Sequence, residues 1–275
     1  MICERIDLYN YFGLERPQGA KGYLDTYIRK ESAEFSADRL RPAMLVIPGG
    51  GYAMVSGREG CPIALAYMTS GFHTFVLDYS VAPLFYPTQL IEAGMAMAWI
   101  RENAQKYLID NDHVAAVGFS AGGHLCGMLA TMFEEKELVG ALGEKAKLCR
   151  PDGVILSYPV ISAGDYAHRG SFINLSGNNP DLYDKLSLEK RVTEKSTPAF
   201  IWSTSEDVTV PCENSLFMAL AYRKVGVPIE LHIFEPGRHG LSTCDEDVNS
   251  PEETVKKWLD LSKTWLANRG FKINL

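Results

Sequence analysis

The stretch "AAVGFSAGGHLCGMLA", residues 115–130, decides the fold expected for this chain, because it joins a buried strand to a helix through a single serine. Up to Gly118 the residues are small and apolar without interruption, which is typical of a strand covered on both faces. After Ser120, apolar residues recur three and four positions apart, which is the spacing of one helix face. The stretch therefore predicts a sharp strand-to-helix turn with Ser120 at its corner.

The composition of this turn suits a nucleophilic serine. A serine hydroxyl is a weak nucleophile near neutral pH, so it needs a base within hydrogen-bond reach and donors for the oxyanion that it creates. A strand-to-helix corner lifts the hydroxyl above the sheet, and the start of the helix offers free backbone N–H groups. Gly118-Phe119-Ser120-Ala121-Gly122 follows the G-x-S-x-G pattern of such corners. A merely tight turn without chemistry is the alternative interpretation.

The rest of the chain alternates between strand and helix patterns. Near-continuous apolar runs predict strands at 43–47, 72–77, 114–118, 153–158, 199–203 and 229–234. Helical patterns fall at about 61–70, 88–107, 121–133, 212–225 and 252–268. Alternating segments at 4–12 and 21–29 predict half-buried strands or a hairpin. Together they predict an α/β fold with a mostly parallel central sheet, helices on both faces and antiparallel N-terminal strands. Because no linker or repeat interrupts it, we expect residues 1–275 to form a single domain.

The last predicted helix carries a start signal of its own. Ser250 stands in the cap position, Pro251 at the first helical position and Glu253 three residues after the cap. The sequence therefore predicts that this helix begins directly after Ser250.

Residues 160–196 interrupt the alternation of strands and helices. A connection of this length in a compact domain is usually functional, such as a lid over a site. A surface excursion with a docked helix near 181–190 is the alternative, and the sequence does not decide between them.

A glycine-rich loop follows the first long strand in "LVIPGGGYAMVSG", residues 45–57. Hydrolases that carry a serine corner often place an oxyanion-binding loop at this point. We expect the amides of Gly50, Gly51 and Ala121 to surround one developing negative charge. The loop lacks the GK[ST] of a phosphate-binding loop and the spacing of a dinucleotide motif. A plain glycine-rich turn is the remaining alternative.

The acid and the base expected for Ser120 both follow late strands. "PAFIWSTSEDVTVP" ends a strand and then offers Glu206 and Asp207, of which Asp207 precedes "VTVP" at the start of the next helix. "IELHIFEPGRHGLS" ends the next strand and then offers His239 between glycines. Since parallel strands end at one edge of a sheet, these side chains are expected to meet Ser120 there. We predict Ser120 as nucleophile, His239 as base and Asp207 as the acid that orients it.

The other histidines are weaker candidates. His124 lies one helical turn after Ser120, so it is expected to pack near the site without acting as the base. His168 falls in the 160–196 segment and either touches substrate or lies on the surface. The remaining histidines fall in or before strand patterns: His73, His113 and His232. The aromatic residues that a sugar ring would stack on are mostly expected in the core: Tyr52, Tyr79, Phe85, Tyr86 and Trp202.

Bulk composition excludes several classes of function. The chain has 27 Lys and Arg against 34 Asp and Glu, a net charge of −7, and no basic stripe, so nucleic acid is not an expected partner. Its apolar stretches are too short to span a bilayer and no signal peptide is recognised, which predicts a cytoplasmic protein. The six cysteines have neither disulfide nor metal-ligand spacing, so no metal site is expected. A homo-oligomer is compatible with the sequence.

These residues together resemble the α/β-hydrolase superfamily, and more narrowly the small bacterial acetyl-xylan and feruloyl esterases. The resemblance runs from about residue 40 to 268 and rests on "PGGGY", "LDYSVAPLFYP", "GFSAGGHL", "SYPVIS", "HRGSF", "TSEDVTVP" and "LHIFEPGRHGLS". It implies an esterase without a cofactor that removes short acyl groups, chiefly acetyl, from acylated sugars. The usual histidine that opens the oxyanion loop is Pro48 here, which puts the support of the loop in question.

Two other functions compete with this one. An amide hydrolase, either arylformamidase-like or a peptidase, would use the same three residues on a different leaving group. A binding protein that keeps the fold without catalysis is disfavoured because nucleophile, base and acid are all present.

Overall fold

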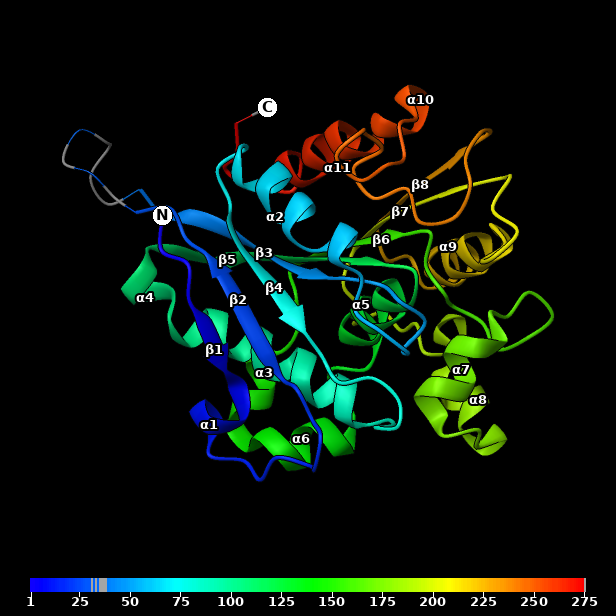
Figure 1. Ribbon diagram of the computed structural model, residues 1–275, viewed down its shortest axis with the longest axis horizontal. Helices are drawn as coiled ribbons and strands as arrows, with labels where there is room; N and C mark the ends of the chain where they lie inside the picture. Colours follow the sequence, from blue (N-terminus) through cyan, green and yellow to red (C-terminus); the bar gives the residue numbers. More distant parts are fainter. Residues whose placement is uncertain (31, 33, 35–38, 275) are drawn as a thin grey trace.

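The computed structural model describes residues 1–30, 32, 34 and 39–274, and in this part of the chain eight strands form one sheet (Figure 1). The strands are β1 (Arg5–Asp7), β2 (Tyr23–Tyr27), β3 (Arg41–Ile47), β4 (His73–Asp78), β5 (Ile109–Phe119), β6 (Gly153–Ser157), β7 (Ala199–Thr204) and β8 (Ile229–Phe234). Their order across the sheet is β1-β2-β4-β3-β5-β6-β7-β8. The first two pairs, β1 with β2 and β2 with β4, are antiparallel and every other pair is parallel. The predicted fold class is therefore confirmed.

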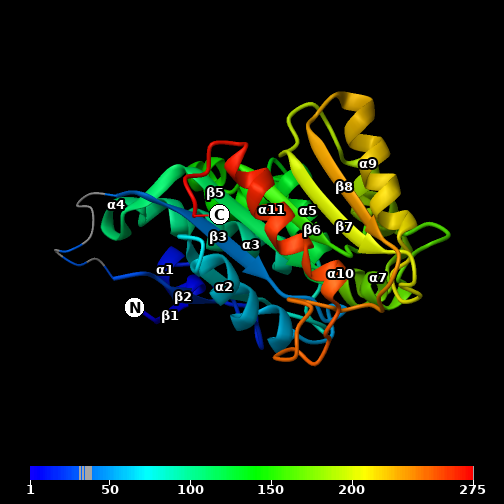
Figure 2. The same cartoon turned by 90° about the horizontal axis from the view of Figure 1, so that it is seen from above.

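Helices cover both faces of this sheet (Figure 2). They are α1 (Leu8–Phe12), α2 (Cys61–Met68), α3 (Thr88–Glu102), α4 (Ala104–Tyr107), α5 (Ala121–Thr131), α6 (Lys136–Leu142), α7 (Arg169–Ser176), α8 (Tyr183–Leu186), α9 (Glu213–Val225), α10 (Glu253–Lys256) and α11 (Trp258–Ala267). One core packs α3, α5, α6 and α9 on the sheet, and the other packs α2 and α11 on the opposite face.

Strand β3 shows why these runs are apolar without alternation. It is buried along its whole length. Ala43, Leu45 and Ile47 face the core beneath α3 and α5, whereas Met44 and Val46 face the core beneath α2 and α11. Because a strand projects successive side chains to opposite faces, a strand between two helical layers has no solvent-facing side.

The N-terminal segment corrects one expectation. Residues 4–12 were predicted as a strand, but the strand stops at Asp7 and a short helix follows. The Asp7 side chain accepts a hydrogen bond from the Asn10 amide at 3.0 Å, which caps the helix start. Gly13, in the left-handed region at φ 64°, ends the helix. Because Asp7 caps a helix, residues 8–12 form α1, although their alternating pattern predicts a strand.

The start of the last helix is also corrected. Ser250 does not cap it, because its hydroxyl instead accepts a hydrogen bond from the Arg238 side chain at 2.8 Å. The helix begins three residues later, at Glu253, where the Glu252 side chain accepts from the Thr254 amide. Ser250 therefore binds Arg238, the residue before His239, instead of capping the helix as the local sequence pattern predicts.

The strand order places a natural site in the middle of the sheet. The chain passes from β3 to β4 on one side and then crosses to β5 on the other side of β3. The loops that leave β3 and β5 therefore diverge, and such a divergence at the carboxyl ends of parallel strands is where ligands bind in α/β proteins. Strands β7 and β8 end at the same edge, so the loops that follow them lie there too.

The corner between β5 and α5 is tight because glycines allow the backbone to approach closely. A Cβ added to Gly122 would lie 2.2 Å from the Ile47 carbonyl oxygen and 2.3 Å from that of Pro48. A Cβ on Gly118 would lie 2.2 Å from the Gly122 carbonyl oxygen. Helix α5 therefore starts directly against the end of β3, which brings Ser120 beside the glycine-rich loop.

We expect Gly122→Ala to lower the free energy of unfolding by at least about 2 kcal/mol, because the clashing atoms are backbone carbonyl oxygens that cannot rotate away. Gly140→Ala is the matched control, since no atom lies within 4 Å of the added Cβ and the residue is inside α6. The control should be unchanged or up to about 1 kcal/mol more stable. Urea unfolding followed by circular dichroism measures both, and equal stabilities would contradict this account of the corner.

Candidate active site

Ser120, His239 and Asp207 meet at the carboxyl-terminal edge of the sheet, although they come from three separate loops. His239 Nε2 lies 2.8 Å from Ser120 Oγ, and His239 Nδ1 lies 2.6 Å from Asp207 Oδ2. Ser120 follows β5, Asp207 follows β7 and His239 follows β8. The structure therefore brings the three predicted residues into one line of hydrogen bonds.

These contacts assign the protons on the His239 ring. A carboxylate only accepts hydrogen bonds, so Nδ1 carries the proton that faces Asp207. Nε2 then holds a free lone pair and accepts from the Ser120 hydroxyl. In this tautomer His239 is oriented to take the proton of Ser120.

Asp207 is held firmly as the partner of His239. Its Oδ1 accepts hydrogen bonds from the amides of Thr209 and Val210, both at 2.9 Å, and its side chain is fully buried. Glu206, the alternative acid, instead accepts from the Gly237 amide at 2.9 Å on the exposed side of the loop. The geometry therefore favours Asp207 over Glu206 as the residue that orients the imidazole.

The backbone of Ser120 is strained. Its φ of 53° and ψ of −118° lie in a region that residues with a side chain rarely adopt. Three hydrogen bonds hold it there: its amide donates to the Ser157 carbonyl, and its carbonyl accepts from the amides of His124 and Val160. The surrounding structure thus fixes the direction in which the Ser120 hydroxyl points.

Backbone amides stand beside this hydroxyl. Gly50 and Gly51 line the hollow of about 470 Å³ that also contains Ser120 and His239. Both glycines have positive φ, at 125° and 64°. Within the residues that the structure describes, neither of these amides nor that of Ala121 has a hydrogen-bond acceptor in the protein. The three amides predicted to bind an oxyanion are therefore available to a ligand.

The 160–196 segment forms one wall of this hollow. His168 and Asn174 line it. The Asn174 side-chain amide donates to the Gly51 carbonyl at 2.9 Å, which ties the segment to the glycine-rich loop. His168 Nδ1 lies 2.8 Å from Ser171 Oγ, and burial, followed by the nearby His239, lowers the pKa of His168. Of the two interpretations offered by the sequence, the geometry favours a segment that borders the site.

His124 lies one helical turn after Ser120, and its ring forms hydrogen bonds with residues other than Ser120. The ring is buried, with Nδ1 2.9 Å from the Tyr52 hydroxyl and Nε2 2.8 Å from the Leu186 carbonyl oxygen. A carbonyl can only accept, so Nε2 carries the proton and Nδ1 accepts from Tyr52. Burial lowers the pKa of His124 to about 4. His124 is therefore a neutral link between the glycine-rich loop and the 160–196 segment.

The remaining histidines lie within strands and contact other groups. His73 Nδ1 accepts from the Arg29 amide, His113 contacts Asp110 and His232 contacts Glu230. Among the candidate aromatic residues, the expectation of core positions holds for Tyr52, Tyr79 and Trp202, which are fully buried, whereas Phe85 is 41% exposed.

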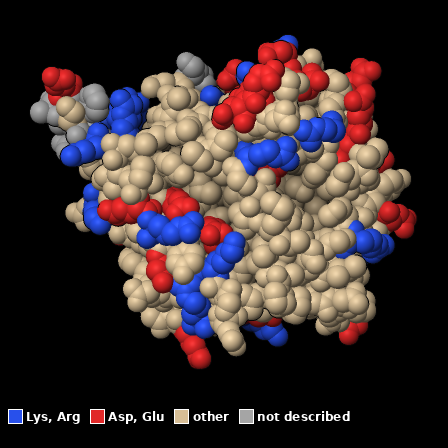
Figure 3. All heavy atoms as spheres, viewed as in Figure 1, with Lys and Arg blue, Asp and Glu red and all other residues tan. Residues whose placement is uncertain are grey.

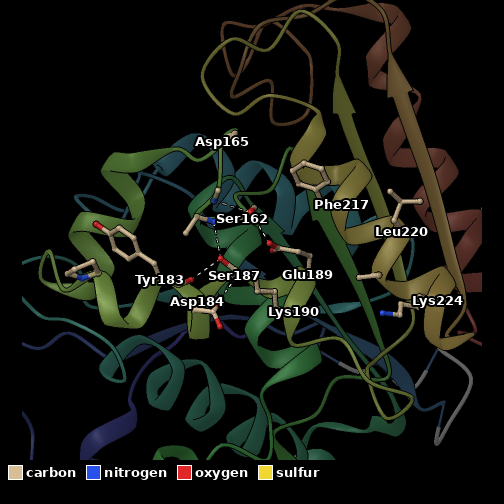
Figure 4. Close-up of a pocket in the computed structure, with 14 residues that line it drawn as sticks. Ser162, Asp165, Tyr183, Asp184, Ser187, Glu189, Lys190, Phe217, Leu220 and Lys224 are labelled. Carbon is tan, nitrogen blue, oxygen red and sulfur yellow. Dashed lines mark hydrogen bonds and ion pairs between the residues drawn. The ribbon is translucent and has the colours of Figure 1, made fainter.

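A second and larger hollow, of about 770 Å³, lies apart from the aligned residues (Figure 4). Phe217 and Leu220 project from α9 on one side, and Ser187 and Glu189 lie on the other. Its lining includes none of the three aligned residues, so its size does not make it the reaction site.

Two features of the described residues bear on other classes of protein. No described cluster of three or more histidine, cysteine, aspartate or glutamate side chains has the geometry to hold a metal ion. Among the described helices, none combines the length and the apolar character needed to cross a membrane.

Reasoning from the sequence missed several residues that shape the site. Arg58, Glu59 and Asn174 line the hollow, and Glu59 is a buried carboxylate. Arg58 and Glu59 directly follow the glycine-rich stretch 45–57, and Asn174 lies in the 160–196 segment, but none of them belongs to a motif that names its role. Tyr158, the last residue of the strand predicted at 153–158, had a positional signal, because parallel strands end at the edge where the site lies.

A family model and several known proteins match this chain, among them two esterase- and xylanase-named relatives. The BD-FAE family model matches residues 24–221. Endo-1,4-beta-xylanase B of Butyrivibrio fibrisolvens is 38% identical over 255 residues, covering 90% of this chain and 39% of the relative. The acetylxylan esterase of Xylanibacter ruminicola is 32% identical over 208 residues, covering 72% of this chain and 40% of the relative. The chain thus spans about two fifths of the length of these relatives.

Solved structures match over nearly the whole length of both chains. The acetyl ester-xyloside bifunctional hydrolase of Caldicellulosiruptor lactoaceticus aligns with a TM-score of 0.83 and 36% identity, covering 98% of this chain and 97% of that one. The carboxylesterase Cest-2923 of Lactobacillus plantarum WCFS1 aligns with a TM-score of 0.82 and 28% identity, covering 98% of each chain.

The buried His124 predicts a loss of stability in acid. The unfolded chain binds a proton near the ordinary pKa of 6.5, whereas the folded protein binds it only near 4, so protons favour unfolding between these values. As the pH falls from 7 to 4, we expect His124 alone to remove up to about 3 kcal/mol of unfolding free energy. Urea unfolding at pH 7, 5.5 and 4 measures the change.

His124→Gln isolates this contribution, since glutamine keeps polar atoms but does not titrate. The variant should be less stable than the wild type at pH 7, and the difference between them should shrink as the pH falls to 4. A difference that stays constant across this range would show that His124 is not the group that responds.

Proposed function

The chain belongs to the BD-FAE family and has the α/β-hydrolase fold, and we propose that it is a serine carboxylesterase that removes short acyl groups, chiefly acetyl, from carbohydrate hydroxyls. The observation that carries this proposal is the unbroken line of hydrogen bonds from Ser120 Oγ through His239 to Asp207. The free amides of the glycine-rich loop lie beside it.

The proposed reaction has two halves. Ser120 Oγ attacks the acyl carbon while His239 Nε2 takes the hydroxyl proton, and the carbonyl oxygen becomes an oxyanion that the amides of Gly50, Gly51 and Ala121 bind. The C–O bond to the sugar then breaks, and His239 gives its proton to the departing sugar oxygen. An acyl ester on Ser120 remains.

Water completes the cycle in the second half. His239 takes a proton from the water as it attacks the acyl carbon, the bond to Ser120 Oγ breaks, and His239 returns the proton to Ser120. The products are the free carboxylic acid and the regenerated serine. Since every atom comes from the protein, the substrate or water, we propose that no cofactor takes part.

The lining of the hollow supports a sugar ester as the substrate. Arg58, His168, Asn174 and Thr209 offer polar groups, while Met54 adds an apolar surface. A sugar ring presents both hydroxyls and apolar C–H faces, so a mixed lining suits it. Figure 3 shows that few charged side chains lie over α7 and α8, beside the carboxyl ends of the strands, which is compatible with an uncharged substrate. The names of two similar proteins, an acetylxylan esterase and an acetyl ester-xyloside bifunctional hydrolase, point to the same class.

Other expectations from the sequence stay predictions. They are a cytoplasmic location, a single domain over residues 1–275, and the compatibility with a homo-oligomer.

Acetate release from acetylated xylo-oligosaccharides tests the proposal. We expect Ser120→Ala to lower kcat at least about 10⁴-fold, because the three aligned residues act as a unit. Ser203→Ala is the matched control: this serine is buried in β7, and its hydroxyl has no hydrogen-bond partner among the described residues. The control should release acetate at nearly the wild-type rate.

Two results would change the proposal. Turnover by Ser120→Ala near the wild-type rate would remove Ser120 as the nucleophile. If the wild type releases no acetate but cleaves an anilide or formamide in a manner that depends on Ser120, the protein is an amide hydrolase with the same site.

A further inference from the structure

We propose that Glu59 is a positioning residue that holds the glycine-rich loop and the loop that carries His239 in fixed relation to each other. This proposal rests on the proposed function only because it requires Ser120 to act as a nucleophile. Glu59 ends the short 3₁₀ turn Gly57–Glu59 that precedes α2. Its Oε2 accepts a hydrogen bond from the Gly49 amide at 2.8 Å, and its Oε1 accepts from the Tyr158 hydroxyl at 2.7 Å.

The first contact anchors the glycine-rich loop. Gly49 directly precedes Gly50 and Gly51, and its own carbonyl accepts from the Ser56 amide at 3.0 Å, which closes the loop on itself. Pro48, one residue earlier, has no amide hydrogen and no polar side chain, so only its carbonyl can be held, and the Tyr79 hydroxyl does so at 2.7 Å. The amide of Gly49 is therefore the nearest donor upstream of Gly50 through which a side chain can fix the loop.

The second contact reaches the loop that carries His239. The Tyr158 oxygen, besides donating to Glu59, accepts from the Ser242 amide at 3.0 Å. The Tyr158 ring packs edge-on against the His239 ring, with centroids 5.0 Å apart. Burial, together with the neighbouring carboxylate of Glu59, raises the pKa of Tyr158, so its hydroxyl stays protonated and can donate. Ser242 in turn donates its hydroxyl to the Arg58 carbonyl, next to Glu59.

The carboxylate is deeply placed, with only 3% of Glu59 exposed. A buried charge is stable only when donors face it, and each oxygen of Glu59 has one. Catalysis needs the amides at Gly50 and Gly51 to be aimed before charge develops, because donors that must first reorient stabilise the oxyanion less. Glu59 supplies this preorganisation through its two hydrogen-bond partners, Gly49 and Tyr158.

Glu59→Gln and Tyr158→Phe test the role with p-nitrophenyl acetate as substrate. Glutamine is the same size but replaces one acceptor by a donor, and phenylalanine keeps the ring but removes the hydroxyl. For Glu59→Gln we expect kcat to fall about 10–100-fold with KM within about twofold, because small misplacements of catalytic donors cost this much. Tyr158→Phe should also lower kcat.

Two matched controls separate positioning from stability. Glu92→Gln alters another buried carboxylate, one that accepts from Tyr9 and Ser80 away from the site. Tyr67→Phe removes another buried hydroxyl, one that bonds Ser262. Both should lower the thermal midpoint about as much as the test variants while leaving kcat near the wild-type value.

A second readout reports on the oxyanion directly. Phenylboronic acid forms a tetrahedral adduct with a reactive serine, so its inhibition constant should weaken in Glu59→Gln by the same factor as kcat/KM. Unchanged kcat in folded Glu59→Gln, or an equal loss in Glu92→Gln, would overturn the proposal. Failure of the proposed function is distinct, because it would appear as wild-type protein that neither cleaves p-nitrophenyl acetate nor reacts at Ser120 with a fluorophosphonate.

Discussion

The site depends on the unusual backbone conformation of Ser120. A non-glycine residue at φ 53° and ψ −118° costs of the order of 1–3 kcal/mol, so neighbouring structure must impose it. The hydrogen bonds to Ser157 and Val160 impose it from the side of β6, and the close approach of Gly122 to the end of β3 imposes it from the other side. The same constraint that strains the serine gives its hydroxyl one direction, toward His239.

Two buried carboxylates near this serine have different partners and therefore different roles. Asp207 and Glu59 each accept hydrogen bonds from backbone amides, which offsets the cost of burying them. Their side-chain partners differ, however. Asp207 faces the His239 imidazole, which in the proposed reaction becomes cationic when it takes a proton, and there it would stabilise that charge. Glu59 faces a tyrosine hydroxyl that stays neutral, so its contribution is restricted to holding loops in place.

The sequence predicts those strands and site residues whose positions follow from local sequence patterns. Strands β3 to β7 are covered by helices on both faces, which leaves apolar runs that can be recognised one at a time, and the edge strand β8 has a similar run although it is only half-buried. Asp207 and His239 could be proposed because each follows such a run, and parallel strands bring their ends together. Glu59 could not, since its partner Tyr158 lies 99 residues away and no spacing links them. Ser250 shows the converse, a correct local signal displaced by a contact with Arg238.

The 160–196 segment is better understood as part of the wall than as a cover that must open. Asn174 bonds the Gly51 carbonyl, the Leu186 carbonyl accepts from buried His124, and the Asn214 side chain on α9 accepts from the Ser162 amide. These three attachments reach the oxyanion loop, the helix behind Ser120 and the helix after Asp207. A segment tied to these three parts of the site cannot shift without disturbing the amides that the proposed reaction needs preorganised. Under the proposed function, selection among substrates would fall to the side chains that the segment presents to the hollow, and His168, which lines the hollow together with Ser120, is the first of them.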